Sequence, residues 1–214
     1  MIFCILGGIS MNHTNQQKVQ IVVADPSALG LFGLSMVCFV AASQKLAWTT
    51  GLSFVIPWAI FLGSAAQMMA SVYDFKHNNV FGATVFGAYG LFWITMALIW
   101  LIKMGALGTV LADAVDVRQL GFAFTGYLIF SVIATIAAME ASKFLFIIMC
   151  FIDVLFFGLA LDAFGLGGKW AHSMAAWSEL IVSLLGFYGC AANFLNKWFG
   201  KTFLPVGKPF GIFR

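Results

Sequence analysis

Hydrophobic residues in this chain are gathered into six long segments, which short polar stretches separate. Each segment has roughly the 20 apolar residues that an α-helix needs to cross the ~30 Å hydrocarbon layer of a membrane. Strands of a membrane β-barrel would instead alternate polar and apolar residues over about ten positions. The pattern therefore predicts an all-α membrane protein with six transmembrane helices, at residues 28–44, 51–73, 81–102, 119–139, 144–161 and 171–195.

The composition supports a membrane domain and leaves no room for a second one. Hydrophobic residues make up 62% of the 214 residues and charged residues only 9%, whereas soluble domains are about 25% charged. The loops between the apolar segments are too short to form a separate domain. We expect a mobile N-terminal arm at residues 1–24, a membrane domain at 25–207 and a C-terminal tail at 208–214.

Lysine and arginine residues predict the orientation in the membrane. An even number of helices places both termini on one side. That side carries more basic residues than the other: Lys18, Lys76, Lys143, Lys197, Lys201, Lys208 and Arg214 against Lys45, Lys103, Arg118 and Lys169. The positive-inside rule then predicts cytoplasmic termini. These residues are scattered and form no basic patch, so nucleic acid is not an expected partner.

Two acidic residues lie within predicted membrane helices. Asp153 is near the centre of the fifth segment, where an ionised carboxylate costs about 2.5–3.5 kcal/mol. It should therefore face a cavity or a partner, or stay protonated. Glu179 lies about two turns from one end of the sixth segment and could also reach the interface or a neighbouring side chain. Both are candidates for proton coupling, with a structural role as the alternative.

Small and polar residues also mark the first three segments. Gly30 and Gly33 leave one helix face almost without side chains, which allows a neighbouring helix to come close. Gln67, deep in the second segment, needs a hydrogen-bond partner, for which a neighbouring helix is the simplest source. In the third segment Phe86, Tyr89 and Trp93 share a helix face, which suits either tight packing or the wall of a pore.

Four motifs, in order, resemble those of the acetate uptake transporters, the succinate–acetate permease group. They are Asp25-Pro26-Ser27-Ala28-Leu29-Gly30-Leu31, Ala66-Gln67, the run from Asn79 to Trp93, and the run from Phe199 to Gly207. The resemblance covers roughly residues 25–207. It implies an aquaporin- or channel-like bundle of six helices, with a central pathway in each protomer of a homo-hexamer. It also implies transport of acetate and related short carboxylates, possibly succinate, in the plasma (inner) membrane.

The resemblance further assigns residues to the transport pathway. A pore constriction is implied at Leu34, Tyr89 and Ile152. The other implied pathway residues are Asp25, Pro26, Ser27, Leu29, Gly30, Leu31, Gln67, Phe86, Phe92 and Trp93. The family is described both as proton symporters and as channels. Proton-coupled uptake is our expectation, and an uncoupled anion channel is the alternative.

Some residues depart from the family pattern. Asp25 replaces an asparagine, and an ionised carboxylate repels an anionic substrate where an amide could donate a hydrogen bond. Asp25 is therefore protonated, or caps the first helix, or alters substrate contact. Ala28, Asp153 and Glu179 also depart from the pattern. No HExxH, GxSxG or CxxC motif occurs, so we expect neither an enzyme nor a cofactor or metal site. A sensor without transport activity is a further alternative.

Overall fold

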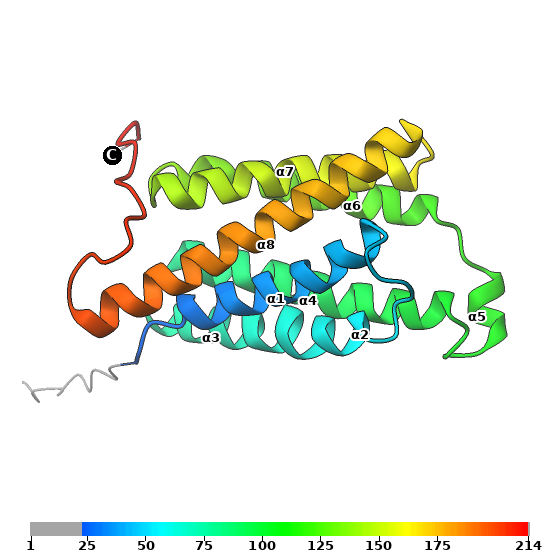
Figure 1. Cartoon of the computed structure of the whole chain (residues 1–214), viewed down its shortest axis with the longest axis horizontal. Coiled ribbons are helices and arrows are strands. Elements are labelled where there is room, and N and C mark those ends of the chain that lie inside the picture. Colours follow the sequence, from blue (N-terminus) through cyan, green and yellow to red (C-terminus); the bar gives the residue numbers. More distant parts are fainter. Residues whose placement is uncertain (1–22, 214) are drawn as a thin grey trace, which may run out of the picture.

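The computed structural model describes residues 23–213, so residues 1–22 of the predicted arm lie outside the described part. Within this range the regular elements are helices (Figure 1). They are α1 (Ser27–Lys45), α2 (Val55–Trp58), the π-helix η1 (Ala59–Ala66), α3 (Gln67–Lys76), α4 (Val80–Lys103), α5 (Thr109–Asp113), α6 (Arg118–Ala138), α7 (Lys143–Ala163) and α8 (Gly168–Phe199). Elements α2, η1 and α3 follow one another without a break and form one rod.

Six of these stretches are long and apolar enough to cross a membrane, which confirms the predicted fold class. The second begins at Val55 rather than at residue 51, because Gly51 has a φ of +80° that no α-helix contains. The sixth is longer than the predicted 171–195. At 32 residues, and a rise of about 1.5 Å per residue, it is longer than the hydrocarbon layer. Its polar ends, including Lys169 and Lys197, continue the helix into water.

Helix α8 runs diagonally across the bundle between α1 and α7, and packs along both (Figure 1). Helix α6 packs along α7, and α4 packs along the rod formed by α2, η1 and α3. Local capping sets two of the helix starts. The Asn79 side chain accepts a hydrogen bond from the Gly82 N–H at 3.2 Å, and Ser142 accepts one from the Leu145 N–H at 3.1 Å.

The C-terminal segment after α8 packs against the turn between α6 and α7. The Phe144 N–H donates to the Val206 carbonyl at 3.0 Å, and the Phe210 N–H donates to the Met139 carbonyl at 2.9 Å. Glu140 accepts hydrogen bonds from the backbone N–H groups of Ile212 and Phe213. The chain end is therefore fixed beside this turn, on the same end of the bundle as the start of α1 (Figure 1).

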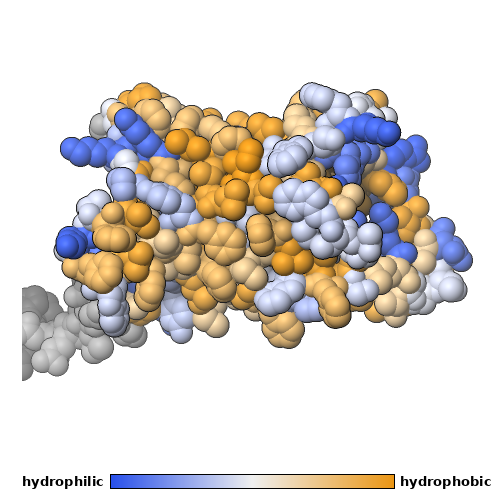
Figure 2. All heavy atoms as spheres, viewed as in Figure 1, coloured by the Kyte–Doolittle hydropathy of each residue, from blue (hydrophilic) through white to orange (hydrophobic). Residues whose placement is uncertain are grey.

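The surface has the polarity expected of a protein that spans a bilayer. Hydrophilic residues gather at the two ends of the bundle, and hydrophobic residues cover the band between them on the face seen in Figure 2. Large apolar side chains such as Phe61, Phe122 and Ile133 are more than 60% exposed within this single chain. Lipid chains or other protein surfaces can cover such residues at no desolvation cost.

Glycines allow the helices to come into backbone contact. A Cβ on Gly33 of α1 would lie 2.4 Å from the Leu62 carbonyl oxygen of η1, and one on Gly158 of α7 would lie 2.9 Å from the Ala175 backbone nitrogen of α8. Backbone atoms cannot move aside as a flexible side chain can. The close approach expected at Gly33 is therefore present, and any side chain there must push α1 and η1 apart.

We expect Gly33→Ala to lower the free energy of unfolding by about 1–3 kcal/mol, because the added methyl overlaps a backbone oxygen. Gly126→Ala on α6 is the matched control, since a Cβ there meets nothing within 4 Å. Thermal unfolding in detergent would measure both. Equal melting temperatures for the two variants would contradict the close packing described here.

Candidate functional site

Three cavities in the described part of the chain follow one another along the bundle. The terminus-side cavity, near the ends of α3 and α8, has a volume of about 100 Å³. The central cavity has about 20 Å³, and the far-side cavity, near the end of α1, has about 250 Å³. Leu34, Tyr89 and Ile152 line both the terminus-side and the central cavity. Phe92 and Trp93 line both the central and the far-side cavity. The three cavities therefore form one interrupted row.

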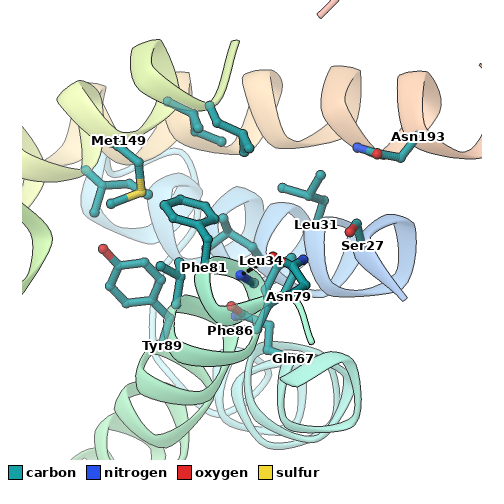
Figure 3. Close-up of a pocket in the computed structure, with 15 residues that line it drawn as sticks. Ser27, Leu31, Leu34, Gln67, Asn79, Phe81, Phe86, Tyr89, Met149 and Asn193 are labelled. Atoms are coloured by element: carbon teal, nitrogen blue, oxygen red, sulfur yellow. Dashed lines mark hydrogen bonds between the residues drawn. The ribbon is translucent and has the colours of Figure 1, made fainter. Parts of the chain in front are cut away.

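Polar side chains line the terminus-side cavity close to helix ends. Ser27 lies at the start of α1, Asn79 caps α4, and Asn193 projects from α8 (Figure 3). The first turns of α1, α4 and α7 all contribute to the lining. Side chains already accept hydrogen bonds from N–H groups at all three helix starts. The helix dipoles still place partial positive charge there, which is favourable for anions. This end of the row therefore favours a negatively charged solute.

Gln67 also lines this cavity, at the point where η1 ends and α3 begins. Its Nε2 donates to the Gly63 carbonyl at 2.8 Å, and both residues belong to the same continuous rod. The expectation of a partner on a neighbouring helix was therefore wrong. Its Oε1 is buried and has no hydrogen-bond partner among the described residues. A buried acceptor of this kind suits a water molecule or a solute that can donate a hydrogen bond.

Tyr89 occupies the centre of the row. Its ring stacks with Phe156 at 6.1 Å and with Tyr127 at 6.4 Å between centroids, and its hydroxyl lies 2.9 Å from Ser131 Oγ. These contacts fix the ring among apolar neighbours, with only 3% of the residue exposed. With Leu34 and Ile152 it separates the terminus-side cavity from the central one, whose volume holds about one water molecule.

Asp153 follows Ile152 on α7 but does not line these three cavities. It faces α6, where Thr135 Oγ1 lies 2.7 Å from Asp153 Oδ2. The other carboxyl oxygen, Oδ1, is buried and has no hydrogen-bond partner within residues 23–213.

Glu179 forms an ion pair with Lys45 at the wall of the far-side cavity. Lys45 Nζ lies 2.8 Å from Glu179 Oε2, and the two side chains are 18% and 2% exposed. Lys103 and His172 also line this cavity. Since the charges of Lys45 and Glu179 offset each other, Lys103 leaves the cavity with a net positive charge, which favours anions. The pairing supports a structural role for Glu179, and its proton-coupling role stays a prediction.

In the motif from Asp25 to Leu31, some residues line the terminus-side cavity and others only contact the rest of the protein. Asp25 accepts a hydrogen bond from the Ser27 N–H at 2.7 Å and pairs with Lys197. Burial alone would raise the pKa of Asp25, but the hydrogen bonds from Lys197 and Ser27 hold it below the ordinary value. Of the three alternatives for Asp25, the structure has the capping one, with an ionised carboxylate.

Some of the other predicted pathway residues line a cavity, and others do not. Ser27, Leu31, Gln67 and Phe86 line the terminus-side cavity (Figure 3). Leu29 is 41% exposed on the outside of the bundle, and Gly30 packs against the Phe86 ring. With Asp25 and Pro26, these residues lie outside the linings of the three cavities.

Sequence reasoning missed several polar residues of the site. Ser131 and Thr135 both approach the Tyr89–Asp153 region, and Asn193 faces the terminus-side cavity. The signal for the first two was present, because they are hydroxyl residues four positions apart in an apolar helix and so share a face. Lys45 and His172 gave no such signal, since they lie near loops where charged residues are common.

A family model for the GPR1/FUN34/yaaH family matches residues 7–206. The chain belongs to this family. It is 30% identical, over 187 residues, to the succinate-acetate/proton symporter SatP of Escherichia coli strain K12, covering 87% of this chain and 96% of that protein. It is 25% identical, over 178 residues, to acetate permease A of Emericella nidulans, covering 80% of this chain and 58% of that protein.

The fold is also similar to a solved structure. The bacterial acetate channel SatP superposes with a TM-score of 0.81 at 30% identity, covering 87% of this chain and 100% of the other. These findings confirm the family and the class of transported solute that the motifs suggested. The names of these two proteins differ on the mechanism, because one describes a proton symporter and the other a channel.

Replacing Glu179 should reveal how much the ion pair stabilises the bundle. We expect Glu179→Gln to lower the free energy of unfolding by about 3 kcal/mol, because Lys45 then loses its buried partner. The double variant Lys45→Met with Glu179→Gln should recover part of the loss. Asp116→Asn, which breaks the exposed pair with Arg118, should have no measurable effect. Chemical unfolding in detergent measures the free energy of unfolding of each variant. Equal losses for Glu179→Gln and Asp116→Asn would contradict the prediction.

Proposed function

We propose that this protein transports acetate and related short monocarboxylates across the plasma (inner) membrane, through the row of three cavities. The observation that carries the proposal is the row itself, which meets at Leu34, Tyr89 and Ile152 and runs through six membrane helices. Membership of a family with named acetate transporters supplies the class of solute. An enzyme is not proposed, because the named relatives are transporters and a channel.

The electrostatics of the row suit a carboxylate. Helix N-termini at the terminus-side cavity and Lys103 at the far-side cavity attract an anion to each end. The apolar centre cannot solvate an unpaired charge, so the carboxylate needs a hydrogen bond or a proton there. Tyr89 lies between the terminus-side and far-side cavities and carries a hydroxyl group, so it can donate a hydrogen bond to the carboxylate at this point.

Transport requires movement at the centre. The central cavity of about 20 Å³ is too small for acetate, so Leu34, Tyr89 or Ile152 must change rotamer as the solute passes. We propose that these three residues form the constriction and select for small carboxylates. A wide passage would admit larger carboxylic acids, whereas a narrow constriction limits the size of the solute.

Proton coupling is the second part of the proposal. Asp153 is the acid closest to the constriction, and Thr135 holds its carboxyl group within the membrane. An acid at this depth is readily neutralised by a proton, and the proton can then cross with the anion. The competing function is an uncoupled acetate channel, which is favoured by the position of Asp153 behind the cavity lining.

We also propose an orientation in the membrane and an assembly. Cytoplasmic termini follow from the distribution of lysine and arginine over the two ends of the bundle. A homo-hexamer is supported by the family resemblance and by the exposed apolar side chains of α6, such as Phe122 and Ile129.

Uptake of labelled acetate into proteoliposomes tests the function and the coupling together. We expect acetate to accumulate above equilibrium only with an inward proton gradient, after subtraction of uptake by protein-free vesicles. Asp153→Asn should remove the dependence on the gradient, while Asp116→Asn, at an exposed position, should retain it. Equilibration that ignores the gradient would establish a channel, and absence of acetate flux would refute the proposed function.

Tyr89→Ala tests the constriction. Removing the ring should open the centre of the row, so that larger carboxylates such as lactate and succinate compete with acetate more strongly than in the wild type. Phe54→Ala is the control, because Phe54 is an exposed aromatic residue just before α2. Competition assays in proteoliposomes measure the change. If Tyr89→Ala leaves both rate and selectivity unchanged, the constriction lies elsewhere.

A further inference from the structure

Three helix ends meet at His172, which lines the far-side cavity near the start of α8. Its Nδ1 lies 3.1 Å from Oδ2 of Asp162, in the last turn of α7. Its Nε2 lies 3.1 Å from the backbone carbonyl oxygen of Lys45, the last residue of α1. One imidazole ring of α8 therefore contacts the ends of two other helices, at the edge of a cavity of the row.

The partners of the two ring nitrogens decide which protonation state fits this geometry. A neutral imidazole has one N–H donor and one bare nitrogen, whereas an imidazolium has two N–H donors. A backbone carbonyl and an ionised carboxylate can only accept hydrogen bonds. A neutral ring would therefore leave its bare nitrogen facing an oxygen lone pair at 3.1 Å. The imidazolium instead donates one hydrogen bond to each partner.

The helix ends around the ring favour the same state. The last carbonyl groups of a helix have no partners within it and carry partial negative charge, which stabilises a nearby cation. Lys45 and Asp162 belong to the last turns of α1 and α7, so two negative helix ends adjoin the ring. The side chain of His172 is 47% exposed, so water can deliver and remove the proton.

The other charged groups at this position leave Asp162 without a second counter-ion. Besides Asp162, the charged residues that α1, α4 and α8 carry at this end of the bundle are Lys45, Lys103, Lys169 and Glu179. Lys45 is paired with Glu179, and the described residues give Asp162 no ion-pair partner except His172. When the ring is neutral, the Asp162 carboxylate therefore repels an anion at this edge of the cavity. Protonation of His172 offsets that charge.

We propose that His172 is a proton-binding positioning residue of the far-side cavity, and that its protonation strengthens the binding of a carboxylate there. The inference rests on the proposed function and deepens it, because it adds a pH-dependent step at one end of the cavity row. The proton passes from water to a ring nitrogen and stays there, while the carboxylate binds as an anion. By linkage, proton and carboxylate each favour the binding of the other.

Protonation acts through geometry as well as charge. The hydrogen bond to the Lys45 carbonyl fixes the end of α1, from which the Lys45 side chain reaches the cavity wall. The loop that follows α1 adds Leu52 to the same wall, and its Trp48 ring packs edge-on against Trp177 of α8 at 6.2 Å between centroids. A neutral ring satisfies only one of its two contacts. The end of α1 and this loop are then held less firmly against α8.

The decisive measurement is the KM for exchange of labelled acetate across proteoliposomes with equal pH on both sides, after subtraction of protein-free vesicles. Values of about pH 5.5 and about pH 8 span the range in which imidazole changes charge. The ratio of the KM at the higher pH to that at the lower pH should be roughly threefold larger in the wild type than in His172→Gln. This is the size expected for one unit charge acting through partly aqueous surroundings. Comparing the two proteins isolates His172 from other titrating groups.

Matched variants separate charge from packing. His77→Gln is the control, because His77 is also exposed at a helix end and contacts a carbonyl, that of Ala24, but lines none of the three cavities. It should keep the wild-type ratio. His172→Lys carries a fixed charge and should give a low KM at both pH values. Asp162→Asn should lower the KM at about pH 8, which keeps the test decisive if His172→Gln does not fold.

The outcomes distinguish the inference from the function beneath it. A wild-type protein that exchanges no acetate would refute the proposed function. Acetate exchange with the same KM ratio in the wild type and in His172→Gln would overturn the inference alone. A His172→Gln variant whose KM rises equally at both pH values would show that His172 only packs, and would equally overturn it. So would an unchanged KM of Asp162→Asn at about pH 8.

Discussion

The lack of water within the hydrocarbon layer is the constraint on which the rest of this structure depends. Each backbone N–H and C=O group there needs a partner within its own segment, which is why the spanning elements are helices. The same constraint applies to polar side chains. Gln67 bonds to the Gly63 carbonyl of its own rod, and Glu179 is paired with Lys45. Most buried polar side chains of the described bundle therefore have partners, and the exceptions are one oxygen each of Gln67, Asp74 and Asp153.

Close packing between helices is what gives the cavity row its shape. Small residues let α1 approach η1 and let α7 approach α8, so most of the interior is filled. Large aromatic rings then fill the middle of the bundle, where Tyr89, Phe92 and Phe156 pack against one another. The remaining space lies at the two ends of this aromatic layer. A solute can therefore occupy the terminus-side and far-side cavities, and the constriction between them limits its passage.

Two acids within the long apolar helices, Glu179 and Asp153, show how surroundings decide the role of a carboxylate. Glu179 has a lysine at 2.8 Å, and the ion pair links the end of α1 to α8. Asp153 has hydroxyl groups as neighbours, which can donate or accept according to the charge of the carboxyl group. An ion pair fixes the charge of a carboxylate, whereas a hydroxyl neighbour accommodates both its charged and its neutral form. This contrast favours Asp153 over Glu179 as the coupling group.

The sequence by itself determined the six membrane helices and the family, because hydropathy and the four motifs are local in the chain. It placed helix ends less well where turn geometry dominates, as at Gly51. Only the tertiary structure decided which helix partners each polar residue: Lys45 meets Glu179 across 134 positions, and Thr135 meets Asp153 across 18. Such contacts depend on how whole helices pack, and packing sums many weak interactions from all segments at once. No local pattern contains that information.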